Sequence, residues 1–227
     1  MKYLSTLLKD VKRQIQDVDG LLTEEDIKSA IGRALRILSF RSPYLVFETI
    51  TGDGTTDEWA LATATWVGGF SKIGTVYYPW DTTDTPTPPP PLDPSCYATY
   101  EKTAGAYWFR LNALTPSASE YVRVYYNSRH SVTDAASTLR DEGDEDSVVL
   151  LAASFCLDMM AVRVIALSNS NIASDTVSYQ TRQSQYEAMS KIYREQSGLS
   201  GYLKDEPPLG GAAFISVGRR PRAVDNF

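Results

Sequence analysis

The sequence is poor in the residues on which most metal sites and many enzymes depend. Its 227 residues include one histidine, His130, and two cysteines, Cys96 and Cys156. A metal site needs several ligands, and no other histidine or cysteine lies near His130 in the sequence. A single histidine also disfavours a Ser/His/Asp catalytic site. We therefore predict no metal site, and we interpret His130 as an ordinary surface or junction residue at the end of a strand.

Motifs that bind phosphate or present a nucleophile are also missing. The Gly-Gly pairs at 68–69 and 210–211 match neither a P-loop nor a dinucleotide fingerprint. No Gly-x-Ser-x-Gly sequence occurs. The acidic run 140–146 lacks the spacing of a calcium-binding loop, and such residues favour the start of a helix. These absences predict a protein that is not an enzyme and has no cofactor.

Long apolar runs and excess positive charge are lacking too. No stretch approaches roughly eighteen consecutive apolar residues, and Lys9 and Asp10 come too early for a signal peptide, so we expect no membrane association. The net charge of −6 argues against binding of nucleic acid through phosphate neutralisation. An acidic wall is compatible with DNA that slides past, because it repels phosphate. The two cysteines lie in unlike settings, which predicts no disulfide and fits a reducing cytoplasm.

Two amphipathic helices are predicted in the first 42 residues. Apolar residues recur at helical spacing over 4–16, where Ser5 or Thr6 is the expected cap. A second helix begins at Thr23, which with Asp26 resembles a capping box. This helix should end before Ser42-Pro43, because the residue before a proline disfavours helical geometry.

The following residues favour strands, and residues 81–95 form a proline-rich segment between them. Prolines cannot donate hydrogen bonds to a sheet, so this segment is expected to be a stiff exposed loop. We predict a meander of six strands at 44–51, 58–67, 73–78, 97–102, 106–111 and 120–126.

Two long helices are predicted near the C-terminal end, at 145–167 and from about 175 to 198, joined by a turn at 168–171. Tyr179, Tyr186 and Tyr193 recur every seven residues and therefore share one edge of the second helix. Tyrosine suits a core or a wet interface, so this edge either packs within the chain or forms a subunit interface.

The last residues, 201–227, are rich in proline and glycine and predict an extended arm that becomes ordered on a partner. A targeting signal, a nucleic-acid tail and a solvated tail are alternatives for its basic end. The residues expected to dock are Phe214, Ile215, Val217, Arg219, Arg220, Arg222 and Phe227.

Together these patterns predict an α+β fold: a four-helix bundle with an inserted antiparallel β-domain and an extended C-terminal arm. The first two helices occupy 1–42, the β-rich insert 43–131, the last two helices 132–200 and the arm 201–227.

Parts of the helical segments resemble the head–tail connector (adaptor, or neck) proteins of tailed phages. The residues that carry this resemblance are Asp26-Ile27, Ala30-Ile31, Ala34-Leu35, Ser42-Pro43, Leu150–Ala153, Ala161, Ile172–Tyr179 and Tyr186 to Tyr193. They cover about half of the chain, in both helical parts, and the β-insert departs from the mainly helical smaller members of the family.

The resemblance implies a homo-oligomeric ring of about twelve copies, stacked beneath the portal protein at the neck of the virion. The arm would dock on the portal, tail or neck proteins would bind the other side, and DNA would pass through the lumen without specific binding. Assembly would take place in the host cytoplasm.

Two other functions remain open from the residues alone. One is a tail-completion or capsid accessory protein whose aromatic β-insert makes the main contact. The other is a carbohydrate-binding β module on a helical stalk, because aromatic side chains stack on sugars. Trp59 and Trp108 would carry the contact in these cases if they were exposed, although aromatic residues of a sheet more often belong to its core.

Overall fold

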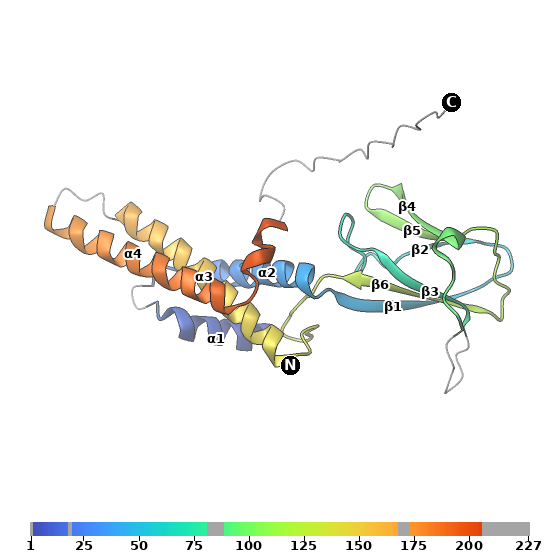
Figure 1. Ribbon diagram of the computed structural model, residues 1–227, viewed down its shortest axis with the longest axis horizontal. Coiled ribbons are helices and arrows are strands. Elements are labelled where there is room, and N and C mark those ends of the chain that lie inside the picture. Colours follow the sequence, from blue (N-terminus) through green and yellow to red (C-terminus); the bar gives the residue numbers. More distant parts are fainter. Residues whose placement is uncertain (1, 18–19, 81–88, 168–172, 206–227) are drawn as a thin grey trace, which may run out of the picture.

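The computed structural model describes residues 2–17, 20–80, 89–167 and 173–205. Helices gather at one end of the molecule and strands at the other (Figure 1). The helices are α1 (Leu4–Ile15), α2 (Glu24–Arg41), α3 (Glu142–Leu167) and α4 (Ala173–Gln196), with short 3-10 turns η1 (Pro94–Cys96) and η2 (Ser200–Asp205). The strands are β1 (Tyr44–Thr51), β2 (Glu58–Ala60), β3 (Ile73–Trp80), β4 (Tyr97–Thr103), β5 (Ala106–Leu111) and β6 (Tyr121–Ser128).

The two N-terminal helices differ in how they begin. The capping box predicted for α2 is confirmed: the Thr23 hydroxyl accepts a hydrogen bond from the Asp26 amide at 3.2 Å, and the Asp26 carboxylate accepts one from the Thr23 amide at 2.8 Å. The cap predicted for α1 is wrong, because Tyr3 occupies the N-cap position and makes no side-chain hydrogen bond there. The N-terminus of α2 is therefore better capped than the N-terminus of α1.

Helix α3 is the centre of the helical end. Almost every residue between Val148 and Leu157 is buried, because α1, α2 and α4 each pack against this helix. Glu142–Ala166 is also the one helix in the described part of the chain that is long and apolar enough to cross a membrane. Its most apolar window is 67% buried inside the molecule, which is the property of a core helix.

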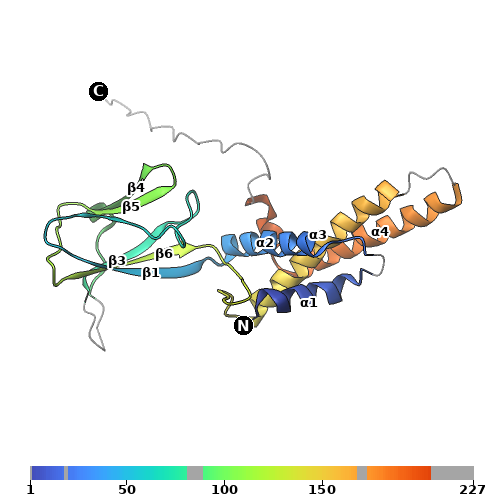
Figure 2. The ribbon, with the colours of Figure 1, turned by 180° about the vertical axis from the view of Figure 1, so that it is seen from behind.

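The predicted four-helix bundle with an inserted domain is wrong. Helix α4 packs along α3, whereas its contacts with α1 and α2 are few among the described residues. Figure 2 shows α1 and α2 in front of α3, while α4 lies in front of α3 in Figure 1. The outer ends of α3 and α4 also extend past α1 and α2. The helices are thus arranged around α3 and leave part of that helix uncovered.

The strands form two separate antiparallel sheets, so the predicted single meander is also wrong. The first has the order β1-β6-β3 and the second has the order β2-β5-β4. The first and last strands pair along their whole length, from Tyr44 opposite Ser128 to Thr51 opposite Tyr121. The strand predicted at 58–67 ends at Ala60. A second core lies between the sheets, with Leu61, Trp66, Val76, Phe109, Leu111, Val122, Val124 and Tyr126 as its buried members.

A small set of contacts joins the helical end to the sheets. The ring of Phe40, on α2, meets the ring of Phe70 edge to face at 5.5 Å between centroids. The Arg129 guanidinium lies 5.4 Å from the Phe70 ring centroid. His130 follows β6, and its amide donates to the Ser39 hydroxyl at 2.9 Å. The junction thus connects two hydrophobic cores that are otherwise distinct.

Candidate interaction surfaces

The tyrosine edge of α4 faces the core as far as its side chains are described. Tyr186 and Tyr193 are half-buried against the helical core, and the Tyr193 hydroxyl lies 3.5 Å from the carbonyl oxygen of Gln14. The side chain of Tyr179 lies outside the described residues. The role of these three residues at a subunit interface stays a prediction, since one copy of the chain is described.

The predicted docking arm lies outside the described residues. This applies to Phe214, Ile215, Val217, Arg219, Arg220, Arg222 and Phe227, and to the turn predicted at 168–171.

Polar contacts hold α4 against α3. The buried Ser190 hydroxyl lies 2.5 Å from a carboxylate oxygen of Asp158 and 3.1 Å from the Ser154 carbonyl oxygen. The Arg194 guanidinium forms an ion pair with the same Asp158. The Asp158 carboxylate therefore joins α3 to α4 through two side chains of α4.

A second ion pair fastens α3 to the start of α2. The Arg163 guanidinium donates two hydrogen bonds to the Asp26 carboxylate, at 2.9 and 3.0 Å, and a third to the Leu21 carbonyl oxygen. Hydrogen bonds from Arg163, and then from Thr23, lower the pKa of Asp26 from 3.8 to about 2. One carboxylate thus closes the capping box of α2 and anchors α3.

An open groove runs across α3 between these two fastenings, and we call it the α3 groove. On the α2 side it has a volume of about 380 Å³, with Phe155, Met159 and Val162 on α3 and Ser29, Ala30 and Arg33 on α2 among its lining residues. On the α4 side a hollow of about 540 Å³ is lined by Glu187, Lys191 and Arg194. Asp158 lines both hollows, so the two adjoin at this side chain of α3.

The α3 groove exposes apolar surface. The side chain of Val162 is 65% exposed. The guanidinium of Arg33 lies 4.1 Å above the Phe155 ring and covers part of that ring. On its α2 side the groove is lined largely by carbon, which is typical of a surface that receives another protein.

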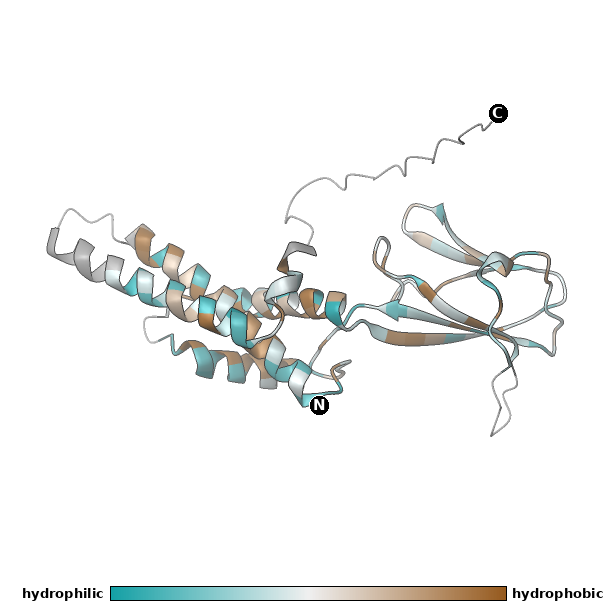
Figure 3. Ribbon diagram, in the orientation of Figure 1, coloured by the Kyte–Doolittle hydropathy of each residue, from teal (hydrophilic) through white to brown (hydrophobic). Residues whose placement is uncertain are grey.

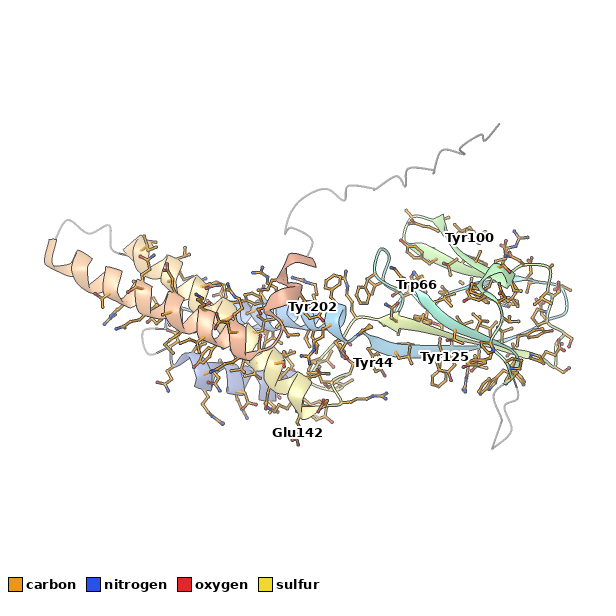
Figure 4. All side chains as sticks on the ribbon, viewed as in Figure 1. Tyr44, Trp66, Tyr100, Tyr125, Glu142 and Tyr202 are labelled. Carbon is orange, nitrogen blue, oxygen red and sulfur yellow. The ribbon has the colours of Figure 1, made fainter. Side chains whose placement is uncertain are left out.

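The outer face of the β1-β6-β3 sheet forms a second exposed surface, the aromatic platform. The Arg123 guanidinium lies 4.3 Å from the Phe47 ring centroid and 4.2 Å from that of Trp80. Tyr125 packs beside Phe47 at 5.7 Å between centroids, and the Phe47 residue is 54% exposed. Figure 4 places Tyr125 on the opposite side of the sheet from Trp66, which faces the inner core.

The aromatic platform was not found from the sequence, although a signal was present. In β1 the residues alternate between half-buried and exposed, so Leu45 and Phe47 point to the same outer face. Figure 3 shows this strand as apolar. The tryptophans named from the sequence are less exposed: Trp59 stacks on Phe109 and packs against the sheet core, and Lys102 covers the ring of Trp108 at 3.9 Å.

His130 lies at the junction of the two ends, as the sequence predicts. Its Nε2 lies 2.7 Å from the Ser42 carbonyl oxygen and its Nδ1 lies 3.1 Å from the Thr138 hydroxyl. Within the part of the chain that the structure describes, no three histidine, cysteine or acidic side chains are grouped to hold a metal ion. Both cysteines are free thiols, and burial raises the pKa of Cys156 to about 12.

Comparison with known proteins gave no match to a family model, to a curated protein or to a solved structure. Two exposed surfaces, the α3 groove and the aromatic platform, are the features of the molecule that bear on its function.

Proposed function

We propose that this protein is a structural virion protein that forms a ring between the capsid portal and the tail and lets DNA pass through its lumen. The observation that carries the proposal is the α3 groove. It leaves apolar side chains such as Val162 open to solvent on the central helix of the molecule. A chain whose most buried helix has one uncovered side is suited to completion by another protein.

The resemblance to head–tail connector proteins supports the same function. Most of the residues that carry it lie on α2, α3 and α4, which are the helices that border the α3 groove. The family pattern and the open surface thus fall on the same part of the molecule, where the resemblance implies contact between copies.

The charge of the chain supports passage of DNA without attachment. The net charge is −6, and Glu142 and Asp144 stand in the first turn of α3 with side chains that are not buried. A lumen with this sign repels phosphate, so it lets a duplex slide rather than bind.

Electron microscopy of a phage lysate tests the proposal. A stop codon early in this gene is expected to yield heads that hold or leak DNA beside finished, unattached tails. Supply of the intact gene in trans should restore joined particles and serves as the control. Intact heads in a lysate without any tails would instead place the protein in the tail pathway. Normal infectious particles would reject a role at the joint between head and tail.

The proposed docking of the arm on the portal has its own test. Deletion of residues 210–227 is expected to abolish pull-down of the portal protein while the far-UV circular dichroism of the helices is unchanged. A truncated protein that still binds the portal would show that docking uses another surface.

A tail-completion or capsid accessory protein is the second candidate, and the aromatic platform favours it. Phe47 and Leu45 are 54% and 61% exposed beside the cation of Arg123, which suits a contact made by the sheet. Replacement of Phe47 by Ser should then block particle assembly, whereas the connector role predicts that Val162→Asp blocks it. A glycan screen against the intact protein tests sugar binding at the same platform, and we expect no binding.

A further inference from the structure

We propose that neighbouring copies contact each other head to tail, with the outer stripe of α4 in one copy seated in the α3 groove of the next. The outer stripe consists of Gln185, Ala188, Met189, Ile192 and Gln196. This inference rests on the proposed ring and names the two surfaces that would join its copies.

The outer stripe occupies one exposed side of α4. Gln185, Ala188, Ile192 and Gln196 are separated by three or four residues, so they follow one another along the same face of the helix. All five stripe residues are exposed, with Met189 at 39% and Ile192 at 50%. A solvent-facing stripe that contains two large apolar side chains and no charge is suited to burial against another protein.

The outer stripe and the α3 groove are on different sides of α4. Ser190 and Tyr186 face α3, while Lys191 and Arg194 line the groove on the α4 side. At about 100° per residue, Ile192 and Met189 lie on the flank of the helix that points away from Lys191 and Arg194. One copy therefore presents both an occupant and a receiving surface, and neither can meet its counterpart within the same chain.

The two surfaces match in chemistry. The floor of the groove is apolar, with Phe155, Met159 and Val162, and an uncharged stripe covers it without burying an unpaired charge. Charged side chains also line the groove, among them Arg33 on the α2 side and Glu187 and Lys191 on the α4 side. Gln185 and Gln196 bring amides that can donate to the carboxylates and accept from the cations. A neighbouring helix would thus cover the side of α3 that α1, α2 and α4 leave open.

The use of two unlike surfaces also explains why a ring would form. A contact between identical patches stops at a dimer, whereas a contact between different patches adds copies until the rotation closes. The occupant is a second copy of this chain because the same hairpin carries both halves of the contact.

Crosslinking between two variants that each carry one accessible cysteine tests the contact. One protein carries Val162→Cys in the groove, the other carries Ile192→Cys in the stripe, and both carry Cys96→Ser. Cys156 is 0% exposed, so a short bis-maleimide reaches the introduced thiols only. We expect the mixture to give a crosslinked dimer at least about tenfold faster than either protein alone, because docking raises the local thiol concentration.

The matched control replaces Val162→Cys with Arg13→Cys on α1, whose side chain is 79% exposed and lies outside both surfaces. Crosslinking of the Val162→Cys and Ile192→Cys pair no faster than this control would overturn the inference. A dominant Val162→Cys homodimer would overturn it too, because that product requires identical patches.

Introduction of a charge into each surface gives a second, independent readout. Val162→Asp and Ile192→Asp should each leave the protein monomeric in sedimentation at high concentration, while their one-to-one mixture forms heterodimers through the two intact surfaces. A mixture that stays monomeric, when the wild type associates, would overturn the inference. Failure of the contact can be told apart from failure of the proposed function. If the mixture stays monomeric, the stop-codon phage can still show unattached tails, and only the contact is rejected. If the two cysteine variants crosslink but the stop-codon phage yields normal particles, the connector role is rejected and the contact stands.

Discussion

The side chain of Asp26 makes two contacts that stabilise the helical end, one at the start of α2 and one with α3. Its carboxylate accepts hydrogen bonds from the Thr23 amide and from the Arg163 guanidinium. The first contact satisfies the start of α2, and the second ties α3 to it. Because both contacts are stronger to the ionised carboxylate than to the neutral acid, the helical end of the molecule should be sensitive to protonation at this residue.

The pH dependence of stability follows from the lowered pKa of Asp26. A carboxyl group whose pKa falls from 3.8 when unfolded to about 2 when folded stabilises the protein above 3.8, and the effect is lost as the pH falls toward 2. The Asp26→Asn variant should therefore be less stable than wild type at pH 7, with a difference that shrinks between these two pH values. Urea unfolding at several pH values measures it.

Glu25→Gln on the same turn of α2 is the control for this experiment, because the Glu25 side chain is 82% exposed and forms a surface ion pair with Lys28. A difference between wild type and Asp26→Asn that stays constant down to pH 2 would contradict the assignment to the Asp26 carboxylate.

At the scale of the element, the N-terminal cap of α2 offers a clean comparison. Thr23→Ala removes the hydroxyl that accepts from the Asp26 amide, and loss of such a cap costs about 1 kcal/mol of unfolding free energy. Thr6→Ala makes the same chemical change in α1, where no side chain caps the helix, and should change stability by less than about 0.5 kcal/mol. Equal losses in the two variants would show that the capping box does not contribute.

Helix α3 should respond very differently to substitutions on its covered and uncovered sides. Leu157 is 0% exposed, so Leu157→Ala leaves a cavity and should cost about 2–5 kcal/mol. Val162 is 65% exposed, and Val162→Ala should cost less than about 0.5 kcal/mol in the monomer. Chemical denaturation of the two variants checks both values. A large loss for Val162→Ala would mean that the α3 groove is closed in solution.

The sequence predicts elements well where the signal is local. The spacing of apolar residues places α1 and α2 within a residue or two of their observed ends, and the Thr23–Asp26 pair marks the start of α2 correctly. The acidic run likewise marks the start of α3. These signals work because helix contacts and caps join residues three or four positions apart.

The arrangement of the elements could not be predicted, because it depends on contacts between residues far apart in the chain. Helix α3 is buried almost all round over Val148–Leu157, so its periodicity does not say which neighbours lie on which side. The pairing of β1 with β6 joins residues far apart in the chain, and six strands of similar composition fit one sheet or two. The α3 groove and the aromatic platform depend on these long-range choices and were therefore missed.

At the scale of the whole molecule, two cores meet at a narrow junction. The helical core and the core between the sheets share few contacts, and Phe70 is the buried side chain that links Phe40 on α2 with Arg129 after β6. All four tryptophans, Trp59, Trp66, Trp80 and Trp108, belong to the strand-rich end. Tryptophan fluorescence therefore reports on the sheets, while circular dichroism at 222 nm reports mainly on the helices.

These two signals can show whether the junction makes the molecule unfold as one unit. We expect the fluorescence and circular dichroism transitions in urea to coincide in the wild type and to separate in Phe70→Ala, because the variant removes the ring that contacts Phe40 and Arg129. Phe47→Ala, on the outer face of β1, removes a ring of the same size away from the junction and should lower stability without splitting the transitions. If the transitions of Phe70→Ala also coincide, cooperativity does not depend on this contact, and the other contacts of the junction, such as the His130 hydrogen bonds to Ser39 and Ser42, are sufficient for it.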